Sequence, residues 1–169
     1  MKFFNFLVLL LFLSFSGVAQ QKYPKKLIQF GWDYPTISYI KENIKRMETR
    51  PFDGVAFSFD FKIFDLFDTT LYEQEKFQFE DLKGIKWKNF TDNFIRVRAQ
   101  SKSGANWLDD SAWEIILKNV KNISKAVMIS GAKGIFFDPE YYYVNPKTDP
   151  WLYDSSFYKG LSYQQVGER

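Results

Sequence analysis

Hydrophobic and polar residues follow strand-like and helix-like patterns in alternation along the chain. Short apolar runs rich in strand-forming residues lie at 26–31, 54–59, 93–99 and 134–137. At 37–47 and 113–128, apolar residues recur at intervals of three and four, which is the spacing of one helix face. A shorter helix is expected within 79–90, so the predicted order is strand, helix, strand, helix, strand, helix, strand.

Capping residues mark where these helices begin and end. Thr36 is placed to cap the first helix, and Ser111 with Glu114 forms a capping-box sequence at the start of the long one. Gly131 is expected to end the long helix in a left-handed conformation. Residues 60–78 have no clear period, and we expect a long loop there.

The order of elements predicts an α/β fold of parallel βα units, because strands joined through helices run parallel. Two architectures fit: a small, open, doubly wound sheet, or the N-terminal half of a TIM (β/α)8 barrel, which takes about 250 residues when complete. The 169-residue chain ends at 162–169 in what looks like a further helix just beginning. We therefore favour a partial barrel over residues 20–169, truncated at its C-terminus.

Residues 1–19 have the features of a signal peptide. Lys2 precedes an apolar stretch over 3–15, and Gly17 and Ala19 supply small residues before an expected cleavage site after Ala19. The stretch is too short for a membrane-spanning helix. We expect a secreted or periplasmic protein that leaves the membrane after cleavage; the alternative is an uncleaved N-terminal anchor.

Composition removes several classes of chemistry. The chain has no cysteine and no histidine, which excludes disulfides, Cys- or His-based zinc sites and His-dependent triads. Its net charge of +3 is too small and too dispersed to indicate a nucleic-acid partner. Acid–base chemistry must use Asp, Glu, Lys, Tyr or Ser, and no cofactor is expected.

Acids and aromatic residues follow the predicted strands, at the ends where parallel α/β folds carry their sites. The candidates along the chain are Trp32, Asp33, Asp60, Trp107, Asp138, Glu140 and Tyr141. Aromatic faces stack on sugar rings, and carboxylates bind hydroxyls or transfer protons, so the pairing suits carbohydrate. The alternative is that aromatics are merely abundant, at 20%, and that the acids cap helices, which is the interpretation we prefer for Asp109 and Asp110.

Asp138 and Glu140 are the sharpest feature of the sequence. Positions i and i+2 of a strand point to the same side, about 7 Å apart. Two carboxylates this close do not ionise independently, so the pKa of one is expected to rise. A carboxyl that keeps its proton near neutral pH can serve as general acid in glycosidic cleavage. The alternative is an acidic turn after a buried strand.

The segment from Gly134 to Tyr141 resembles the fourth-strand segment of (β/α)8-barrel glycoside hydrolases. The wider pattern is similar to secreted bacterial glycoside-hydrolase-like proteins, in pieces at 30–35, 50–55, 90–95, 107–110 and 134–141. In many such families a Glu at the end of strand four is the acid/base catalyst, so the resemblance implies this role for Glu140, with Asp138 beside it. It also implies a sugar site lined by Trp32, Asp33, Trp107 and Tyr141.

The leading hypothesis is therefore a secreted glycoside hydrolase that cleaves an oligosaccharide or polysaccharide by carboxylate chemistry. A half barrel lacks the late strand that usually carries the nucleophile, so the chain by itself would be inactive. The first alternative is a non-catalytic carbohydrate-binding protein on the same scaffold. The second is a divalent-metal hydrolase whose oxygen ligands would be Asp33, Asp60, Asp138 and Glu140.

Overall fold

The computed structural model describes most of the chain after the N-terminal segment. The described residues are 25–31, 33–61, 64–102, 106–140, 149, 151–155 and 158–168. The predicted signal peptide, Trp32 and Tyr141 lie outside them. Within these ranges no helix is both long enough and apolar enough to cross a membrane.

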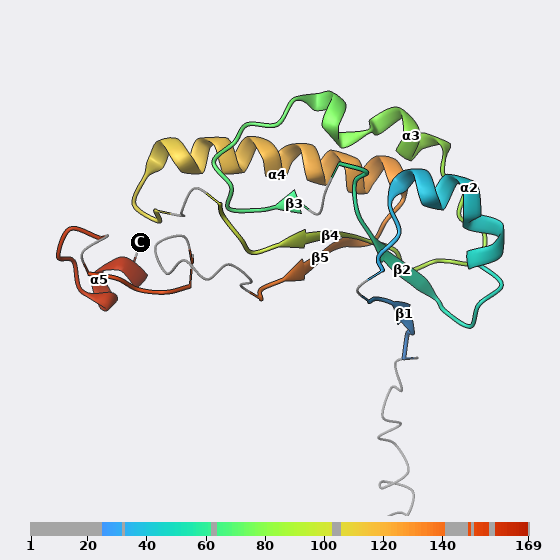
Figure 1. Ribbon diagram of the computed structural model, residues 1–169, viewed down its shortest axis with the longest axis horizontal. Helices are drawn as coiled ribbons and strands as arrows, with labels where there is room; N and C mark the ends of the chain where they lie inside the picture. The colour runs from blue at the N-terminus through green and yellow to red at the C-terminus, as the bar shows by residue number, and fades with distance from the viewer. Residues whose placement is uncertain are drawn as a thin grey trace, which may run out of the picture.

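Strands and helices alternate as the sequence pattern predicts (Figure 1). The strands are β1 (Ile28–Gln29), β2 (Gly54–Phe57), β3 (Phe64–Asp65), β4 (Phe94–Arg98) and β5 (Gly134–Asp138). The helices are α2 (Ile37–Met47), α3 (Phe79–Gly84), α4 (Asp110–Ser130) and α5 (Tyr163–Gly167), with a 3-10 turn at Gln74–Phe77.

All strand pairs in the sheet are parallel, which confirms the predicted α/β class. β5 pairs with β4 over all five residues of β4, so β2 and β3 share the opposite edge of that strand. β3 thus continues the line of β2 after an interruption. The prediction of a loop throughout 60–78 is wrong here, because a two-residue strand is too short to produce a sequence period.

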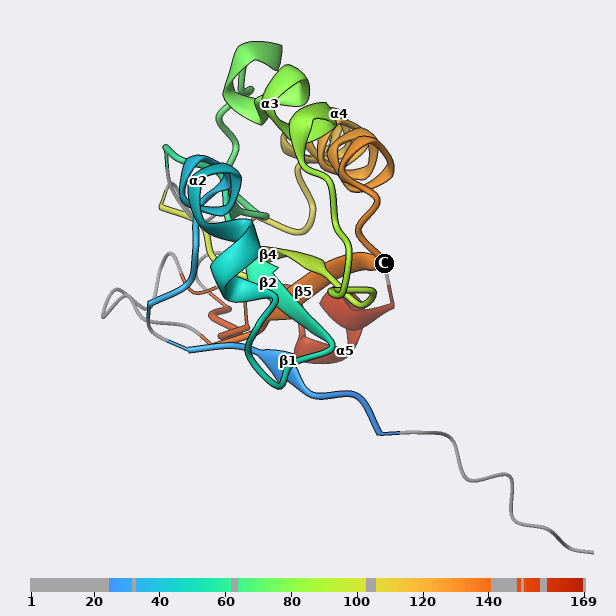
Figure 2. The same ribbon diagram turned by 90° about the vertical axis from the view of Figure 1, so that its right-hand side faces the viewer.

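The spatial order of the strands follows the chain, and the sheet is open. Among the described residues β1 pairs only with β2, and β5 only with β4, so these two strands form the edges. Helices α2, α3 and α4 cover one face of the sheet, and α5 lies beyond the carboxyl ends of the strands (Figures 1 and 2). A doubly wound sheet has helices on both faces, whereas α2, α3 and α4 share one face.

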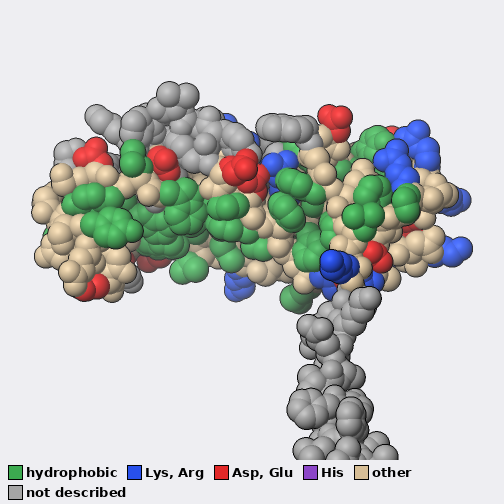
Figure 3. All heavy atoms as spheres, turned by 90° about the horizontal axis from the view of Figure 1, so that it is seen from below, with side chains coloured by type: hydrophobic (Ala, Val, Ile, Leu, Met, Phe, Trp, Pro, Cys, Tyr) green, Lys and Arg blue, Asp and Glu red, His purple; other side chains and the backbone are tan. Residues whose placement is uncertain are grey.

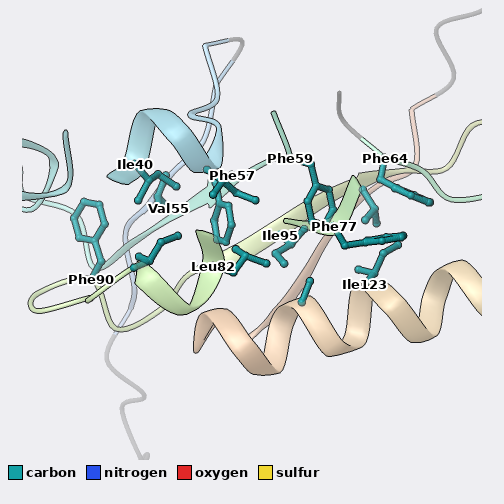
Figure 4. Close-up of a cluster of buried hydrophobic side chains, with 14 of the residues drawn as sticks. Ile40, Val55, Phe57, Phe59, Phe64, Phe77, Leu82, Phe90, Ile95 and Ile123 are labelled. Carbon is teal, nitrogen blue, oxygen red and sulfur yellow. The ribbon is translucent and has the colours of Figure 1, made fainter. Parts of the chain in front are cut away.

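The main hydrophobic core fills the space between the sheet and these helices. Figure 4 shows Ile40 of α2, Ile95 of β4 and Ile123 of α4 pointing into this space, and all three are almost fully buried. Five buried phenylalanines add to it: Phe57, Phe59, Phe64, Phe77 and Phe90. Side chains alternate between faces along a strand, so Phe94, Arg96 and Arg98 lie on the face opposite the helices.

The ends of the helices show which capping predictions hold. Thr36 caps α2, and its hydroxyl accepts from the backbone N–H of Tyr39 at 3.4 Å. Gly131 ends α4 with φ +69°, as expected. The cap of α4, however, is Asp109 and not the predicted Ser111. The Asp109 carboxylate accepts from the backbone N–H groups of Ser111 and Ala112, because the helix begins two residues earlier than the capping-box pattern indicates.

The close approach of two backbone segments at the start of β2 requires glycine. A Cβ atom on Gly54 would lie 1.9 Å from the carbonyl oxygen of Asp92, whereas one on Gly134, at the start of β5, would meet nothing within 4 Å. We expect Gly54→Ala to lower the free energy of unfolding by about 1–3 kcal/mol, because the strand must move. Urea unfolding followed by tryptophan fluorescence measures this.

Gly134→Ala is the matched control for this substitution. It places the same methyl group at the start of the other glycine-led strand, and its expected effect is within about 0.5 kcal/mol. Equal losses in the two variants would contradict the steric explanation.

Candidate functional site

A cleft opens on the face of the sheet away from the helices, where β4 and β5 end. It has a volume of about 400 Å³, and Phe30, Arg96, Phe136, Asp138 and Glu140 are among its lining residues. We call it the strand-end cleft. Figure 3 views the molecule from this side and shows hydrophobic side chains running across the middle of the face.

Arg96 is the central charged residue of this cleft. Its Nη2 lies 2.6 Å from Oδ2 of Asp138, and the side chains of the two residues are 8% and 7% exposed. The guanidinium carbon also lies 4.9 Å from the ring centre of Phe30 and 5.0 Å from that of Tyr34, within the range of cation–π contact. Arg96 is therefore held by a carboxylate and by two aromatic rings.

Asp138 is a fixed anion in this arrangement. Besides its ion pair with Arg96, its Oδ1 accepts from the backbone N–H of Glu140 at 3.2 Å. The cation nearest to Asp138 is therefore the guanidinium of Arg96, on the neighbouring strand. Sequence spacing shows that the two carboxylates are near each other but does not show the cation between the strands.

Glu140 is the carboxylate whose side chain is exposed in the cleft. Its backbone is held on both sides: the N–H donates to Asp138, and the carbonyl accepts from Nε2 of Gln100 at 3.0 Å. The backbone of Glu140 is thus held by the end of β5 and by the segment that follows β4. Of the predicted catalytic pair, Glu140 thus lies exposed in the cleft, and the buried Asp138 binds its backbone N–H.

A second buried ion pair lies beside the first at the strand ends. Arg98 of β4 donates through Nε to Oδ1 of Asp65 at 2.8 Å, and Asp65 is fully buried on β3. Sequence reasoning missed Arg96, Arg98 and Asp65. The sequence did carry one signal, which is the presence of two arginines in an apolar strand. A buried charge requires a partner of opposite charge, but the sequence does not say which acids are the partners.

Asp60 has a structural role at the start of α2. Its carboxylate accepts from the backbone N–H and hydroxyl of Ser38 and from Nε2 of Gln78. Partial burial by itself would raise the pKa of Asp60, but these hydrogen bonds outweigh it and hold the pKa below its ordinary value. The same contacts stabilise Gln78, a non-glycine residue with φ +48°.

Trp107 lies in a different hollow, which we call the aromatic pocket. It has a volume of about 560 Å³ and lies between the start of α4 and the C-terminal segment. Its ring-bearing lining residues are Trp107, Trp113, Trp151, Tyr153, Tyr158 and Tyr163. The indole N–H of Trp113 donates to the backbone carbonyl of Trp107, and the hydroxyl of Tyr153 donates to the backbone carbonyl of Leu161. Because these polar groups are bonded within the protein, ring surfaces form much of the pocket wall. The pocket and the strand-end cleft share no lining residue.

Asp33 lines a third hollow, next to the strand-end cleft. This outer hollow has a volume of about 780 Å³, and its wall includes Asp33, Tyr34, Tyr39 and Arg50. It shares Phe30 and Gly31 with the strand-end cleft. The structure therefore places Asp33 beside the cleft that holds Glu140, while Asp60 and Trp107 line neither hollow.

The acids of the metal-hydrolase alternative do not converge. Within the described ranges no three acidic side chains are grouped so that they could hold a metal ion. The carboxylate of Asp60 is bound by Ser38 and Gln78, and that of Asp138 by Arg96. This disfavours a metal centre of three or more carboxylates made from these residues.

Comparison with protein-family models, curated protein sequences and solved structures finds no match to this chain. Function is therefore inferred from the three hollows and the groups that line them.

The Arg96–Asp138 ion pair is expected to contribute strongly to stability. Arg96→Met or Asp138→Asn leaves an isolated buried group, and each is expected to lower the free energy of unfolding by about 3–5 kcal/mol. The double variant should lose less than the sum, because neither charge then lacks a partner. Urea unfolding of all four proteins gives the coupling energy.

The exposed pair Lys41–Asp81 is the control for this cycle. Its atoms are 2.5 Å apart, but the side chains are 41% and 43% exposed. Removal of either partner is expected to cost no more than about 1 kcal/mol. Similar coupling energies for the two pairs would contradict the assigned role of burial.

The depressed pKa of Asp60 predicts a loss of stability in acid. Its charge stabilises the folded state above the ordinary aspartate pKa of about 3.9, and this contribution disappears as the pH falls through the lower pKa of the folded state. We expect Asp60→Asn to cost about 0.5–1 kcal/mol at pH 7 and progressively less below about pH 4. Ser38→Ala, which removes a donor to the same carboxylate, should act in the same direction. A difference between wild type and Asp60→Asn that stays constant down to about pH 2 would contradict this.

Proposed function

We propose that the strand-end cleft binds carbohydrate and that Glu140 is the acid/base residue of a glycoside hydrolase. The observation that carries this proposal is the placement of Glu140, whose backbone is fixed by Asp138 and Gln100 while its side chain is exposed in a cleft. The stacked rings of Phe30 and Phe136, 4.3 Å apart, line the same cleft. A rigid carboxylate beside aromatic surface is suited to a sugar ring and its glycosidic oxygen.

The arrangement of the sheet supports a barrel as the scaffold. Successive βα units of a (β/α)8 barrel pair in chain order and keep their helices on one face, as the strands and helices α2 to α4 do here. We propose that the described sheet is an arc of such a barrel. Its site would then lie at the carboxyl ends of the strands, where Glu140 lies. A signal peptide over residues 1–19, as the sequence predicts, would take this activity outside the cytoplasm.

The proposed reaction assigns different tasks to the two acids. Glu140 donates a proton to the glycosidic oxygen as the bond breaks. Asp138, neutralised by Arg96, holds the backbone of Glu140 in place. Glycosidic hydrolysis uses two working carboxylates, about 5–5.5 Å apart in retaining enzymes and about 6.5–9.5 Å apart in inverting ones. The proposal places the second of these outside the described lining of the cleft.

The aromatic pocket favours a second candidate function, which is carbohydrate binding without catalysis. Trp107 lies 5.3 Å from Trp113 and 6.1 Å from Trp151 between ring centres, so three indoles border one hollow. Ring faces of this kind bind sugars without proton chemistry. In this case Trp107 and Trp151 would carry the affinity, and Glu140 would contribute little.

Glu140→Gln in a complete (β/α)8 barrel that contains this chain separates the two functions. If Glu140 is the acid/base residue, release of reducing ends from a panel of polysaccharides should fall at least about 100-fold, while calorimetric affinity for oligosaccharides changes by less than about threefold. Glu75→Gln, an exposed acid on the 3-10 turn, is the matched control. Binding without hydrolysis in the wild-type complete barrel, lost in Trp107→Ala, would favour the binding protein. An absence of both activities would reject the two proposals together.

A further inference from the structure

We infer that the aromatic pocket binds a flat, uncharged aromatic compound that carries a hydrogen-bond acceptor at one edge. The inference goes beyond the proposed function, which concerns the strand-end cleft and Glu140. The alternative of carbohydrate binding expects a sugar in the aromatic pocket, so the class of ligand that binds there separates that alternative from this inference.

The aromatic pocket has the size of a small-molecule site. Its volume of about 560 Å³ falls within the range of about 300–1,000 Å³ that is typical of such sites, which are lined mainly by apolar and aromatic side chains. Its wall comes from the start of α4 and from the C-terminal segment with α5, which lie at the same end of the molecule (Figure 1). Segments far apart in the sequence thus form one hollow with room for a molecule of about two or three rings.

The indoles of the pocket are held by a ring behind them. Phe67 is 8% exposed and meets Trp107, Trp113 and Trp151 in perpendicular contacts, with ring centres 5.1, 6.4 and 5.9 Å apart. Such edge-to-face contacts are the favoured geometry of aromatic pairs. One buried ring therefore restricts the orientation of three indoles, so a ligand meets a wall that is largely preformed and spends little free energy on ordering it.

Two rings of the wall keep surface for a ligand. Trp151 is 51% exposed and Tyr163 75% exposed. Trp151 contacts Phe67 at 85° and Trp107 at 43° between ring planes, and Tyr163 contacts Tyr153 at 81°. Among the described residues, no other ring is thus stacked flat on Trp151 or Tyr163. Each leaves ring surface on which a flat molecule can stack.

Three hydrogen-bonding side chains of the wall bond to the protein itself. The indole N–H of Trp113 donates to the backbone of Trp107, and the hydroxyl of Tyr153 donates to the backbone of Leu161. Tyr158 is 3% exposed, and its hydroxyl has a backbone hydrogen bond with Trp107. A sugar would lose water from several hydroxyls on entry and find few replacements here, and that loss costs free energy.

The polar groups on the exposed side of the pocket favour an acceptor. Within the described part of the chain, neither the indole N–H of Trp151 nor the hydroxyl of Tyr163 has a hydrogen-bond partner. The indole N–H can only donate, and the phenol hydroxyl can also donate. A carbonyl or ether oxygen at the edge of the ligand would accept from either group.

The charge of the wall favours an uncharged ligand. None of the lining residues within the described ranges is charged. A charged group that enters such a pocket loses water and gains no counter-ion, which is costly. The ligand is therefore neutral as well as flat.

Equilibrium dialysis of the full chain against 2-acetylnaphthalene tests the inference. This probe has two fused rings, a carbonyl oxygen and no charge. We expect it to bind with a dissociation constant below about 0.1 mM. Naphthalene, which lacks the acceptor, should bind about three- to tenfold more weakly. The anion 2-naphthoate should bind at least about tenfold more weakly than 2-acetylnaphthalene, and a six-unit oligosaccharide of glucose should not displace the probe.

Variants at the two exposed rings separate stacking from hydrogen bonding. The double variant Trp151→Phe with Tyr163→Phe keeps two rings and removes both donors. It should bind 2-acetylnaphthalene as weakly as naphthalene and leave the affinity for naphthalene unchanged. The double variant Trp151→Ala with Tyr163→Ala removes the ring surface and should weaken the binding of both probes at least about tenfold.

Two measurements control for structural effects. Urea unfolding of each variant should match the wild type within about 0.5 kcal/mol, because both positions are more than half exposed. Leu117→Ala, at an exposed position of α4 outside the pocket lining, should change neither affinity.

Displacement of the probe by the oligosaccharide would overturn the inference and favour a sugar in this pocket. Equal affinity for naphthalene and 2-acetylnaphthalene, or tighter binding of 2-naphthoate, would overturn the assigned class of ligand. Unchanged affinity in the double alanine variant, or no binding of either neutral probe to the wild type, would overturn the inference and leave the proposed role of Glu140 unaffected.

Discussion

The guanidinium of Arg96 is buried against the face of the sheet opposite the helices, where an unpaired charge would cost several kcal/mol, and the strand ends are arranged to neutralise it. Asp138 on β5 supplies the negative charge at 2.6 Å, so the ion pair joins β4 to β5 near their carboxyl ends. Phe30 and Tyr34, in the segment after β1, contact the same cation through their rings. Three segments far apart in sequence thus meet at one charge, and the strand-end cleft forms around it.

This constraint also gives the two neighbouring acids different surroundings. Because Arg96 occupies one carboxylate oxygen of Asp138 and the backbone N–H of Glu140 occupies the other, Asp138 is fully engaged in structure. The same N–H bond, together with the bond from Gln100, fixes the backbone of Glu140. A residue with a rigid backbone and an exposed carboxylate can meet a ligand in a defined geometry, which general acid catalysis requires.

Most acids that follow the strands bind the protein itself. Asp60 binds the first turn of α2, Asp109 caps α4, and Asp65 neutralises Arg98. The hydroxyl of Ser111 and the N–H of Ala112 also hold the pKa of Asp109 below its ordinary value, which keeps the cap charged. Acids at parallel strand ends are therefore weak evidence of a site until their partners are known. Glu140 and Asp33 differ from these three because they line neighbouring hollows that share Phe30.

The sequence by itself determined the alternation of strands and helices, the parallel sheet and the ends of helices at Thr36 and Gly131, because periodicity and capping are local properties. It could not show β3, whose two residues have no period, and although a capping role for Asp109 was expected, the capping-box pattern placed the start of the long helix two residues too late, at Ser111. It placed Asp138 near Glu140, since two residues on one strand have a fixed separation. Only the tertiary structure decided that Arg96, 42 residues away, pairs with Asp138 and that Trp107 lies in a separate pocket. Pairing between distant residues depends on how the chain packs, and this single sequence does not record it.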